Sequence, residues 1–493
     1  MNRPNWTFPA ADFRRALMSL PVTQAWESLD PPELAQICIP SAHAKALSPD
    51  HTIVEGMRGA GKSFWTAVLA DDNTRRFVAD TESLSGSAGL VVRVGFGLDL
   101  ADEQFPTATR IGELLGMGQG PDAIWRAVLL RHAFHYLKRD LPFADRDWTE
   151  AVRWVADHPG ATTGYLTDAD RALAEDGKVL LLLFDSLERL ADDWGGVRRI
   201  LAAALKLGLE CRTRRAIRCK FFLRPDMVEE EDEVWRFADS SKLLHAKAKL
   251  DWRPDDLYGV ILLHLLNSPS VGAEFRRNLE QSGNECGQAI RGAYRLPRRM
   301  TSDSVRAAIE ALAGPWVGAS ARRGYTYTWI TTHLADAKGR LSPRSILLAF
   351  RQAAEWTDSR QREHSCALHY QGVQQGVVEA SKIRISEIKE DYPWVDPLLR
   401  ALHDTTVPLS FDELSARWTP RCIDEALAAA ANQRRLPPRR YSSDPLRKPL
   451  SLVEDLVELA VLYQSEDKKR FNMPDIFRVG FGIKRKGGVR PPR

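Results

Sequence analysis

The stretch of sequence that decides the fold reads Gly56-Met57-Arg58-Gly59-Ala60-Gly61-Lys62-Ser63. It follows a short β-prone run at 52–55 and precedes an apolar run at 64–69 that is typical of the first turns of a helix. Glycines between a strand and a helix let backbone N–H groups surround phosphate oxygens, because no Cβ stands in the way. In this context the spacing G-x-x-x-x-G-K-S predicts a phosphate-binding loop.

Two side chains of this loop have the chemistry that a nucleoside triphosphate needs. The ammonium of Lys62 can reach the β- and γ-phosphates, and the Ser63 hydroxyl can ligate Mg²⁺. The N-terminus of the following helix adds partial positive charge. We expect ATP and Mg²⁺ as cofactors, since no Asn-Lys-x-Asp motif that would specify guanine is apparent. The residues predicted to bind the nucleotide are Gly56, Met57, Arg58, Gly59, Ala60, Gly61, Lys62, Ser63 and Phe64.

A second element supports the first. Residues 178–184 are a nearly continuous apolar run that ends at Asp185. Such runs are typical of strands buried on both faces of a parallel sheet. A carboxylate at the C-terminal end of such a strand lies in the crevice where these sheets bind ligands. We therefore predict that Asp185 holds Mg²⁺, directly or through water.

Two interpretations of the hydrolytic base stay open. Many P-loop ATPases of the additional-strand class place Glu directly after this Asp, whereas here the position is Ser186 and the first acid is Glu188. Glu188 either polarises the attacking water or starts a helix, where acids favour the first turn. In the second case Asp99, after the strand expected at 90–96, is the next candidate.

Length and composition are those of a multidomain globular chain. The 493 residues predict two to four domains, and a hydrophobic content of 44% with 27% charged residues is ordinary for such chains. No run approaches the roughly 18 apolar residues of a membrane span, and the N-terminus lacks the apolar segment of a secretory signal. The six cysteines show neither a C-x-x-C pair nor zinc spacing. We expect a cytoplasmic protein with reduced thiols and no membrane partner.

Strand and helix patterns alternate through the first half of the chain. β-prone runs recur at 52–54, 90–96, 179–185, 219–224 and 244–250, with a helical insert at about 110–175. This alternation predicts a P-loop core with a parallel sheet and helices on both faces. The predicted domains are a helical lead-in at 1–50, the α/β P-loop NTPase core at 51–255, a helical lid at 256–400 and a winged-helix-like domain at 401–493.

Arginines occur at three places where P-loop ATPases use them. Arg224 ends the strand expected beside that of Asp185, and it either touches the γ-phosphate or lytic water or forms a salt bridge with Asp226. Arg344 follows Ser342-Pro343, a helix start, and it either meets the γ-phosphate from the lid or forms a structural salt bridge. A third group either lends an arginine finger to a neighbouring copy in a homo-oligomer or lies in a solvated connection; it comprises Arg212, Arg214, Arg215 and Arg218.

The C-terminal part has a different pattern. Capping boxes of the form S-x-x-E at Ser410 and Ser451 open apolar-periodic helices, and residues 472–483 alternate like a strand. Helices followed by a strand or hairpin are the layout of a winged helix. The surrounding basic residues favour contact with a nucleic-acid backbone, and the alternative is docking of a protein effector. These residues are Arg434, Arg435, Arg439, Arg440, Arg447, Lys448, Lys468, Lys469, Arg470, Lys484, Arg485, Lys486, Arg490 and Arg493.

Together these motifs resemble STAND/KAP-type P-loop ATPases within the broader AAA+-like group. The resemblance rests on the phosphate loop, Asp-x-Leu-acid at 185–188, Phe-Leu-Arg-Pro-Asp at 222–226, Lys-Leu-Asp-Trp at 249–252 and Ser-Pro-Arg at 342–344. More narrowly, residues 472–482 and 392–394 are similar to a little-characterised group of bacterial P-loop ATPases.

The resemblance implies a nucleotide-driven regulatory switch in which ATP closes the lid and, for many members, a role in defence against phage or mobile DNA. Ser186 departs from the Asp-Glu and Asp-Asp forms of the group, which puts rapid hydrolysis in question. Two functions follow: a regulatory ATPase with DNA or a protein effector as partner, and a nucleotide-stabilised scaffold with little turnover. No nuclease, protease or deaminase constellation is visible in the sequence.

Overall fold

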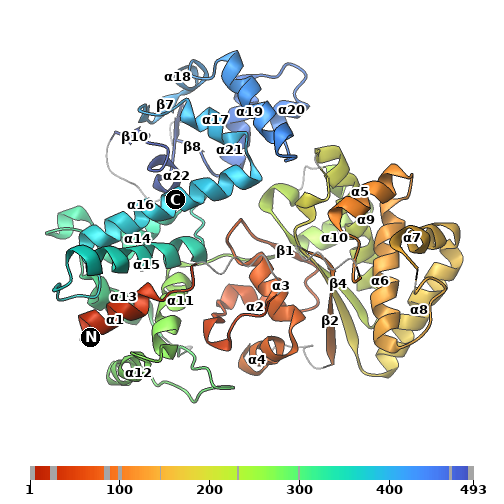
Figure 1. Ribbon diagram of the computed structural model, residues 1–493, viewed down its shortest axis with the longest axis horizontal. Helices are drawn as coiled ribbons and strands as arrows, with labels where there is room; N and C mark the ends of the chain where they lie inside the picture. Colours follow the sequence, from red (N-terminus) through yellow and green to blue (C-terminus); the bar gives the residue numbers. More distant parts are fainter. Residues whose placement is uncertain are drawn as a thin grey trace. The chain divides into compact units, whose positions relative to one another are not determined.

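The computed structural model describes residues 6–22, 30–82, 89–97, 103–144, 146–191, 193–229, 233–297, 300–465 and 469–486 (Figure 1). The chain divides into two compact units, which we call the α/β unit and the helical unit. The α/β unit comprises Trp26–Pro32 and Ser41–Leu250. The helical unit comprises Met1–Ala25, Glu33–Pro40 and Asp251–Arg493.

A five-stranded parallel sheet forms the core of the α/β unit. Its spatial order is β2–β3–β4–β1–β5. The apolar run before Asp185 forms a strand that is almost completely buried, as predicted. The strands are β1 (Ile53–Glu55), β2 (Leu90–Phe96), β3 (Val179–Phe184), β4 (Ile217–Leu223) and β5 (Ala248–Lys249).

The strand order places β4 between the strand that precedes the phosphate loop and the strand that precedes Asp185. Phe184 of β3 pairs with Phe221 of β4, and Glu55 of β1 pairs with Leu223 of β4. The C-terminal ends of these three strands therefore meet at one edge of the sheet, where parallel sheets bind ligands. This is the additional-strand arrangement of a P-loop NTPase core.

Helices cover both faces of the sheet, as predicted (Figure 1). Helix α3 packs against β2 and β4. Helices α6 and α9 pack against each other; α6 also contacts β2, and α9 also contacts β4. The indole N–H of Trp125 in α6 donates to the carbonyl of Ile200 in α9 (3.1 Å), and its ring meets Phe184 edge-on. The helices are α2 (Ala44–Leu47), α3 (Lys62–Ala70), α4 (Asp72–Glu82), α5 (Ala108–Gly116), α6 (Pro121–Leu137), α7 (Trp148–Asp157), α8 (Pro159–Glu175), α9 (Trp194–Arg212) and α10 (Ser240–His245).

The fifth predicted strand is shorter than expected. The start of the run at 244–250 belongs to the end of α10, and only Ala248–Lys249 pairs with β1. The apolar run that suggested a strand is shared between two elements, since Leu243 and Leu244 are buried from the helix and Ala248 and Leu250 from the strand and its end.

A buried lysine ties β4 to the segment before β1. Lys220 is fully buried, and its Nζ donates to the carbonyls of Ser48 (2.8 Å) and His51 (2.7 Å). Burial lowers the pKa of Lys220 to about 7, against a weak opposing effect of Asp50. Lys220 thus fixes the segment that leads into β1, and its pKa is lowered because the buried ammonium has lost its hydration.

The pKa of Lys220 predicts that stability rises with pH. Between about pH 7 and 10.5 the unfolded chain holds a proton on this lysine that the folded chain has released, so the free energy of unfolding increases across that window. Lys220→Met removes this dependence, which amounts to a few kcal/mol over the window. Denaturant unfolding of both proteins at several pH values measures it, with the exposed Lys249→Met as control. Equal pH slopes for wild type and Lys220→Met would contradict the assignment.

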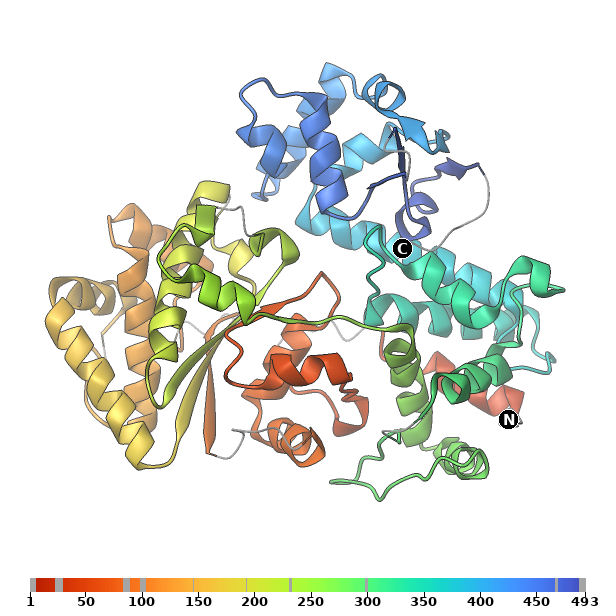
Figure 2. The same cartoon turned by 180° about the vertical axis from the view of Figure 1, so that it is seen from behind.

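Long helices build the first part of the helical unit (Figure 2). The two longest, α15 and α16, pack against each other, and a Cβ on Gly376 would stand 2.1 Å from the carbonyl oxygen of Ala349. That position therefore needs glycine. The helices are α1 (Ala10–Met18), α11 (Pro254–Asn267), α12 (Gly272–Gln281), α13 (Ser302–Ala313), α14 (Thr326–Leu334), α15 (Pro343–Arg360) and α16 (Tyr370–Asp391).

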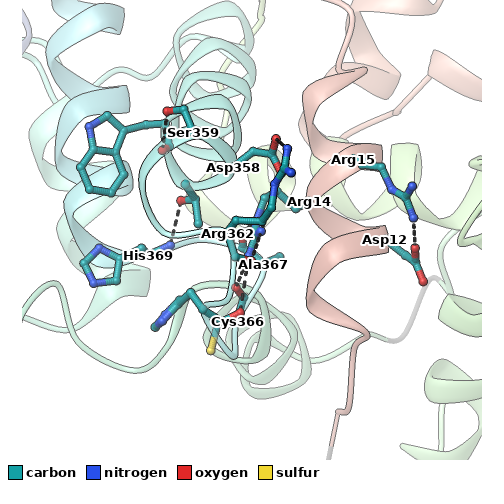
Figure 3. A network of polar contacts seen from close by, with 12 residues as sticks. Asp12, Arg14, Arg15, Asp358, Ser359, Arg362, Cys366, Ala367 and His369 are labelled. Atoms are coloured by element: carbon teal, nitrogen blue, oxygen red, sulfur yellow. Dashed lines mark hydrogen bonds and ion pairs between the residues drawn. The ribbon is translucent and has the colours of Figure 1, made fainter.

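A buried arginine fastens the N-terminal helix to this unit. Arg14 of α1 is fully buried and points into the turn after α15, whereas Arg15 faces the other way and pairs with Asp12 (Figure 3). The Arg14 guanidinium donates to the carbonyls of Ala367 (2.9 Å) and Arg362 (2.6 Å). Because carbonyls of this turn accept hydrogen bonds from the buried guanidinium, α1 is an integral part of the helical unit.

The end of the chain has the winged-helix-like layout that the sequence predicts. A three-stranded antiparallel sheet has the order β7–β9–β8. The last strand along the chain, β9, pairs with β8 on one side and with β7 on the other. The capping box at Ser410 is confirmed, since Ser410 and Glu413 exchange side chain–backbone hydrogen bonds. The elements are α17 (Val395–Arg400), β7 (Leu409–Ser410), α18 (Phe411–Ser415), α19 (Pro420–Asn432), α20 (Arg439–Ser443), α21 (Pro449–Glu458), β8 (Tyr463–Gln464) and β9 (Arg470–Asn472).

Two local predictions in this region are wrong. Residues 472–483 contain the short helix α22 (Asp475–Arg478) in place of the expected strand, because Met473, Ile476 and Phe477 are buried together at helical spacing. The helix expected to start at Ser451 is α21, which begins two residues earlier, and the Ser451 hydroxyl donates to Asp444. After α22, β10 (Lys484–Arg485) pairs with β6 (Thr406–Val407).

Within the described ranges, no helix is both long enough and apolar enough to cross a membrane.

Candidate phosphate-binding site

The phosphate loop makes the tight turn that its glycines allow. Gly61 has φ 101° and caps α3, a left-handed conformation that residues with a Cβ rarely adopt. The N–H of Ala60 donates to the carbonyl of Met57 (3.1 Å), and the N–H of Gly56 donates to the carbonyl of Leu223 at the end of β4 (3.0 Å). The loop is thus closed on itself and anchored to the neighbouring strand.

The Lys62 ammonium lies over this loop. Its Nζ donates to the carbonyls of Gly56 (2.9 Å) and Met57 (3.2 Å), both of them loop residues. The charge is therefore held at the place where the loop would enclose phosphate oxygens. A phosphate would offer this ammonium anionic acceptors, which make stronger hydrogen bonds than neutral carbonyls.

The two predicted metal ligands come together from different strands. Ser63 at the start of α3 donates its hydroxyl proton to Asp185 Oδ2 (2.7 Å), and the N–H of Ser186 donates to Asp185 Oδ1 (2.9 Å). Burial raises the pKa of Asp185, and the Ser63 hydrogen bond and the Lys62 charge oppose that effect. The carboxylate is thus fixed in place by groups on both of its oxygens.

This pair of oxygen ligands fits Mg²⁺. A hydroxyl and a carboxylate are hard oxygen donors, and Mg²⁺ in nucleotide sites is commonly held by one or two side chains together with phosphates and water. The part of the chain that the structure describes contains no cluster of three or more His, Cys, Asp or Glu side chains that could hold a metal without such help. The arrangement therefore suits a metal that arrives with a nucleotide.

The candidate base Glu188 lies one turn beyond Asp185. Ser186 has φ 60° and ψ 30°, a left-handed turn that leads into the 3-10 helix Leu187–Arg189. Glu188 Oε2 is buried and has no hydrogen-bond partner among the described residues, and its charge raises the pKa of Asp185. This oxygen is therefore available to accept a hydrogen bond from a water molecule. The alternative base, Asp99, lies outside the described residues.

Arg224 lies at the expected edge of the sheet, and its guanidinium is paired. It follows β4 directly, and its Nε and Nη2 donate to the two carboxylate oxygens of Asp226 (3.2 and 2.9 Å). Both side chains are buried. The structure thus shows the salt bridge that sequence analysis gave as the alternative to a sensor role, at the same edge as Asp185.

Arg344 also forms an ion pair, within the helical unit. It lies in the first turn of α15 after Pro343, and its Nη1 donates to Glu387 of α16 (2.6 Å). Arg384 donates to the second oxygen of Glu387 (3.0 Å). Burial opposes ionisation of Glu387, but the charges of Arg384 and Arg344 outweigh it and hold the pKa of Glu387 below its usual value. Ser342 occupies the N-cap position without a side-chain capping bond.

Members of the other two arginine-rich groups also have local partners. Arg214 pairs with Glu210 (2.6 Å), and Arg218 donates to the carbonyl of Arg214 (2.8 Å), at the end of β4 opposite to Arg224. In the C-terminal group Arg485 is almost completely buried and lies 3.2 Å from Asp475. Lys484 pairs with Asp404, and both Arg439 and Arg440 pair with Glu458. Lys468, Arg490 and Arg493 lie outside the described residues.

No protein-family model and no curated protein matches this chain. Among solved structures, it is similar to the ORC2 protein of Aeropyrum pernix in its ADPNP-ADP complexes, with 13% identity over 92% of this chain and 93% of that chain and a TM-score of 0.38. A Walker-type ATPase of Pyrococcus abyssi shares 11% identity over 92% and 99% of the two chains, also with a TM-score of 0.38. Cdc6p from Pyrobaculum aerophilum shares 12% over 86% and 83%, with a TM-score of 0.27. The strand order and the phosphate loop by themselves show a P-loop NTPase core.

Proposed function

We propose that this chain binds ATP with Mg²⁺ and hydrolyses it as a regulatory switch. The observation that carries the proposal is the contact between the Ser63 hydroxyl and Asp185 Oδ2 (2.7 Å), which joins the phosphate loop to the end of β3. Lys62 lies on the same loop, and the loop has the turn geometry that phosphate binding needs. These features support a nucleotide site at the C-terminal edge of the sheet.

Each residue has a distinct task in the proposed reaction. Lys62 would exchange the carbonyls of Gly56 and Met57 for β- and γ-phosphate oxygens. Ser63 and Asp185 would hold Mg²⁺, which when bound would neutralise charge on the phosphates. Glu188 Oε2 takes a proton from a water molecule while the oxygen of that water forms a bond to the γ-phosphorus. The bond from that phosphorus to the bridging oxygen breaks, so that ATP and water become ADP and phosphate.

A second candidate function is a nucleotide-stabilised scaffold with little turnover, whose partner is a protein effector. Ser186 supports it, because it stands at the position where an acid directly after Asp185 would activate water. Phosphate release by the full chain, with and without DNA, separates the two functions. Sustained release favours the switch, whereas binding without release favours the scaffold.

Asp185→Asn tests the metal site. The variant is expected to keep Mg²⁺-free nucleotide binding, because Lys62 and the loop are untouched, and to lose the gain in affinity that Mg²⁺ gives to the wild type. Titration of a fluorescent ATP analogue with and without Mg²⁺ measures both quantities. The exposed Asp168→Asn serves as control. A full Mg²⁺ response in Asp185→Asn would remove Asp185 from the metal site.

A further inference from the structure

A short hairpin connects α13 to α14 in the helical unit. The N–H of Val317 donates to the carbonyl of Gly324, and the N–H of Thr326 donates to the carbonyl of Pro315, both at 3.0 Å. These bonds flank the antiparallel bridge between Trp316 and Tyr325. That bridge is therefore a non-hydrogen-bonded pair, in which the two side chains stand close together on the same face.

The hairpin is built to hold this shape. Val317 is buried and anchors one strand, while the tip is closed by the 3-10 turn Ala321–Arg323. The stem of Arg323 packs against Gly318, where an added Cβ would stand 2.7 Å from Arg323 Cγ. The exposure of the two rings is thus set by a defined local structure.

The two rings are unusual in being exposed. Trp316 is 39% and Tyr325 46% accessible, and among the described residues they are the only aromatic members of the exposed large hydrophobic side chains. Exposed aromatic rings gathered at one place mark interaction sites more often than scattered ones do. Here both are neighbours across one hairpin.

The tip of the same hairpin carries positive charge. Arg322 and Arg323 are exposed, and within the described ranges neither side chain has an ion-pair partner. Arg306 of α13 lies 5.2 Å from the centre of the Tyr325 ring, with its own charge paired to Glu310 (2.7 Å). The hairpin therefore presents two flat rings beside two unneutralised guanidinium groups.

We propose that this hairpin binds single-stranded nucleic acid, with bases stacked on Trp316 and Tyr325 and phosphates bound by Arg322 and Arg323. Stacking on aromatic rings beside a positively charged track is how proteins hold single strands without reading their sequence. A duplex keeps its base faces covered and offers the two rings nothing to stack on. This site differs from the C-terminal basic group, in which Arg485 forms an ion pair with Asp475. None of the residues of the proposed site belongs to the phosphate loop.

The test measures the affinity of the full chain for a labelled oligothymidylate by fluorescence anisotropy at several salt concentrations. Trp316→Ala and Tyr325→Ala should each weaken binding about fivefold or more through lost stacking. They should leave the salt dependence unchanged, and Trp316→Phe should restore most of the affinity. The double variant Arg322→Ala/Arg323→Ala should reduce the log–log salt slope by about one to one and a half units, as expected for two single-strand phosphate contacts.

Two controls make the result specific. On an abasic strand, which has phosphates but no bases, Trp316→Ala should bind as the wild type does. Arg421→Ala, at an exposed arginine of the winged-helix-like region that pairs with Glu425, should bind oligothymidylate as the wild type does. Absence of single-strand binding by the wild type, or unchanged binding by the alanine variants, overturns the proposal and moves the hairpin to docking of a protein partner.

Discussion

Lys62→Ala is expected to abolish tight ATP binding while the chain stays folded. The side chain supplies the positive charge that faces the β- and γ-phosphates, and hydrogen bonds to charged groups are the strong ones in such sites. Their loss should weaken binding by about a hundredfold or more, since each contributes about 1.5–3 kcal/mol. Isothermal titration with ATP and Mg²⁺ measures the affinity directly.

The fold should tolerate this change, because the Lys62 ammonium donates to carbonyls of its own loop, those of Gly56 and Met57. Lys178→Ala, at the opposite end of the sheet, is the matched control and should bind ATP as the wild type does. A folded Lys62→Ala protein with wild-type affinity for ATP would end the assignment of this loop as a nucleotide site.

The sheet shows how far sequence reasoning reaches. The phosphate loop and the apolar run before Asp185 predict two parallel strands, and the structure confirms both strands. The sequence predicts β4 beside β3, and the structure confirms that neighbour. The pairing of β4 with β1 on its other side could not be predicted, because strand pairing depends on contacts between residues far apart in the chain. The position of β4 between β3 and β1 decides which residues meet, since it brings Arg224 to the edge where Asp185 lies.

Short apolar runs were the weakest basis for prediction. In residues 472–483 the alternation of apolar and polar residues suggested a strand, yet Met473, Ile476 and Phe477 also have helical spacing and are buried from a helix. Periods of two and of 3.6 residues cannot be separated over so few residues. Burial against the rest of the helical unit, including a hydrogen bond from Ser381 of α16 to the carbonyl of Ile476, decides between them.

The salt-bridge partner of Arg224 could be proposed from the sequence, whereas the partner of Arg344 could not. Asp226 lies two residues from Arg224, so their salt bridge could be proposed from the sequence. Glu387, the partner of Arg344, lies on another helix, and no local pattern connects the two. The hairpin with Trp316 and Tyr325 was missed, although glycines near aromatic residues and arginines at 314–325 were a signal of a turn that presents them.

Glu188→Gln is expected to keep ATP binding and to cut turnover by roughly 10²-fold or more, the usual loss when a general base is removed. The buried Oε2 of Glu188 lacks a hydrogen-bond partner among the described residues, so an amide of the same shape should fit without breaking a structural bond there. Phosphate release under saturating ATP measures turnover, and titration of the same variant with ATP shows that binding is retained.

The exposed Glu233→Gln is the control for this measurement, since it removes a carboxylate of the same unit that pairs with Arg236 at the surface. Unchanged turnover in Glu188→Gln would make Glu188 a helix-start acid and leave Asp99 as the next candidate for the base. The wild type decides between the two proposed functions in the same assay. If it binds ATP but releases no phosphate, Glu188→Gln has nothing to reduce, and the nucleotide stabilises a scaffold in place of driving a switch.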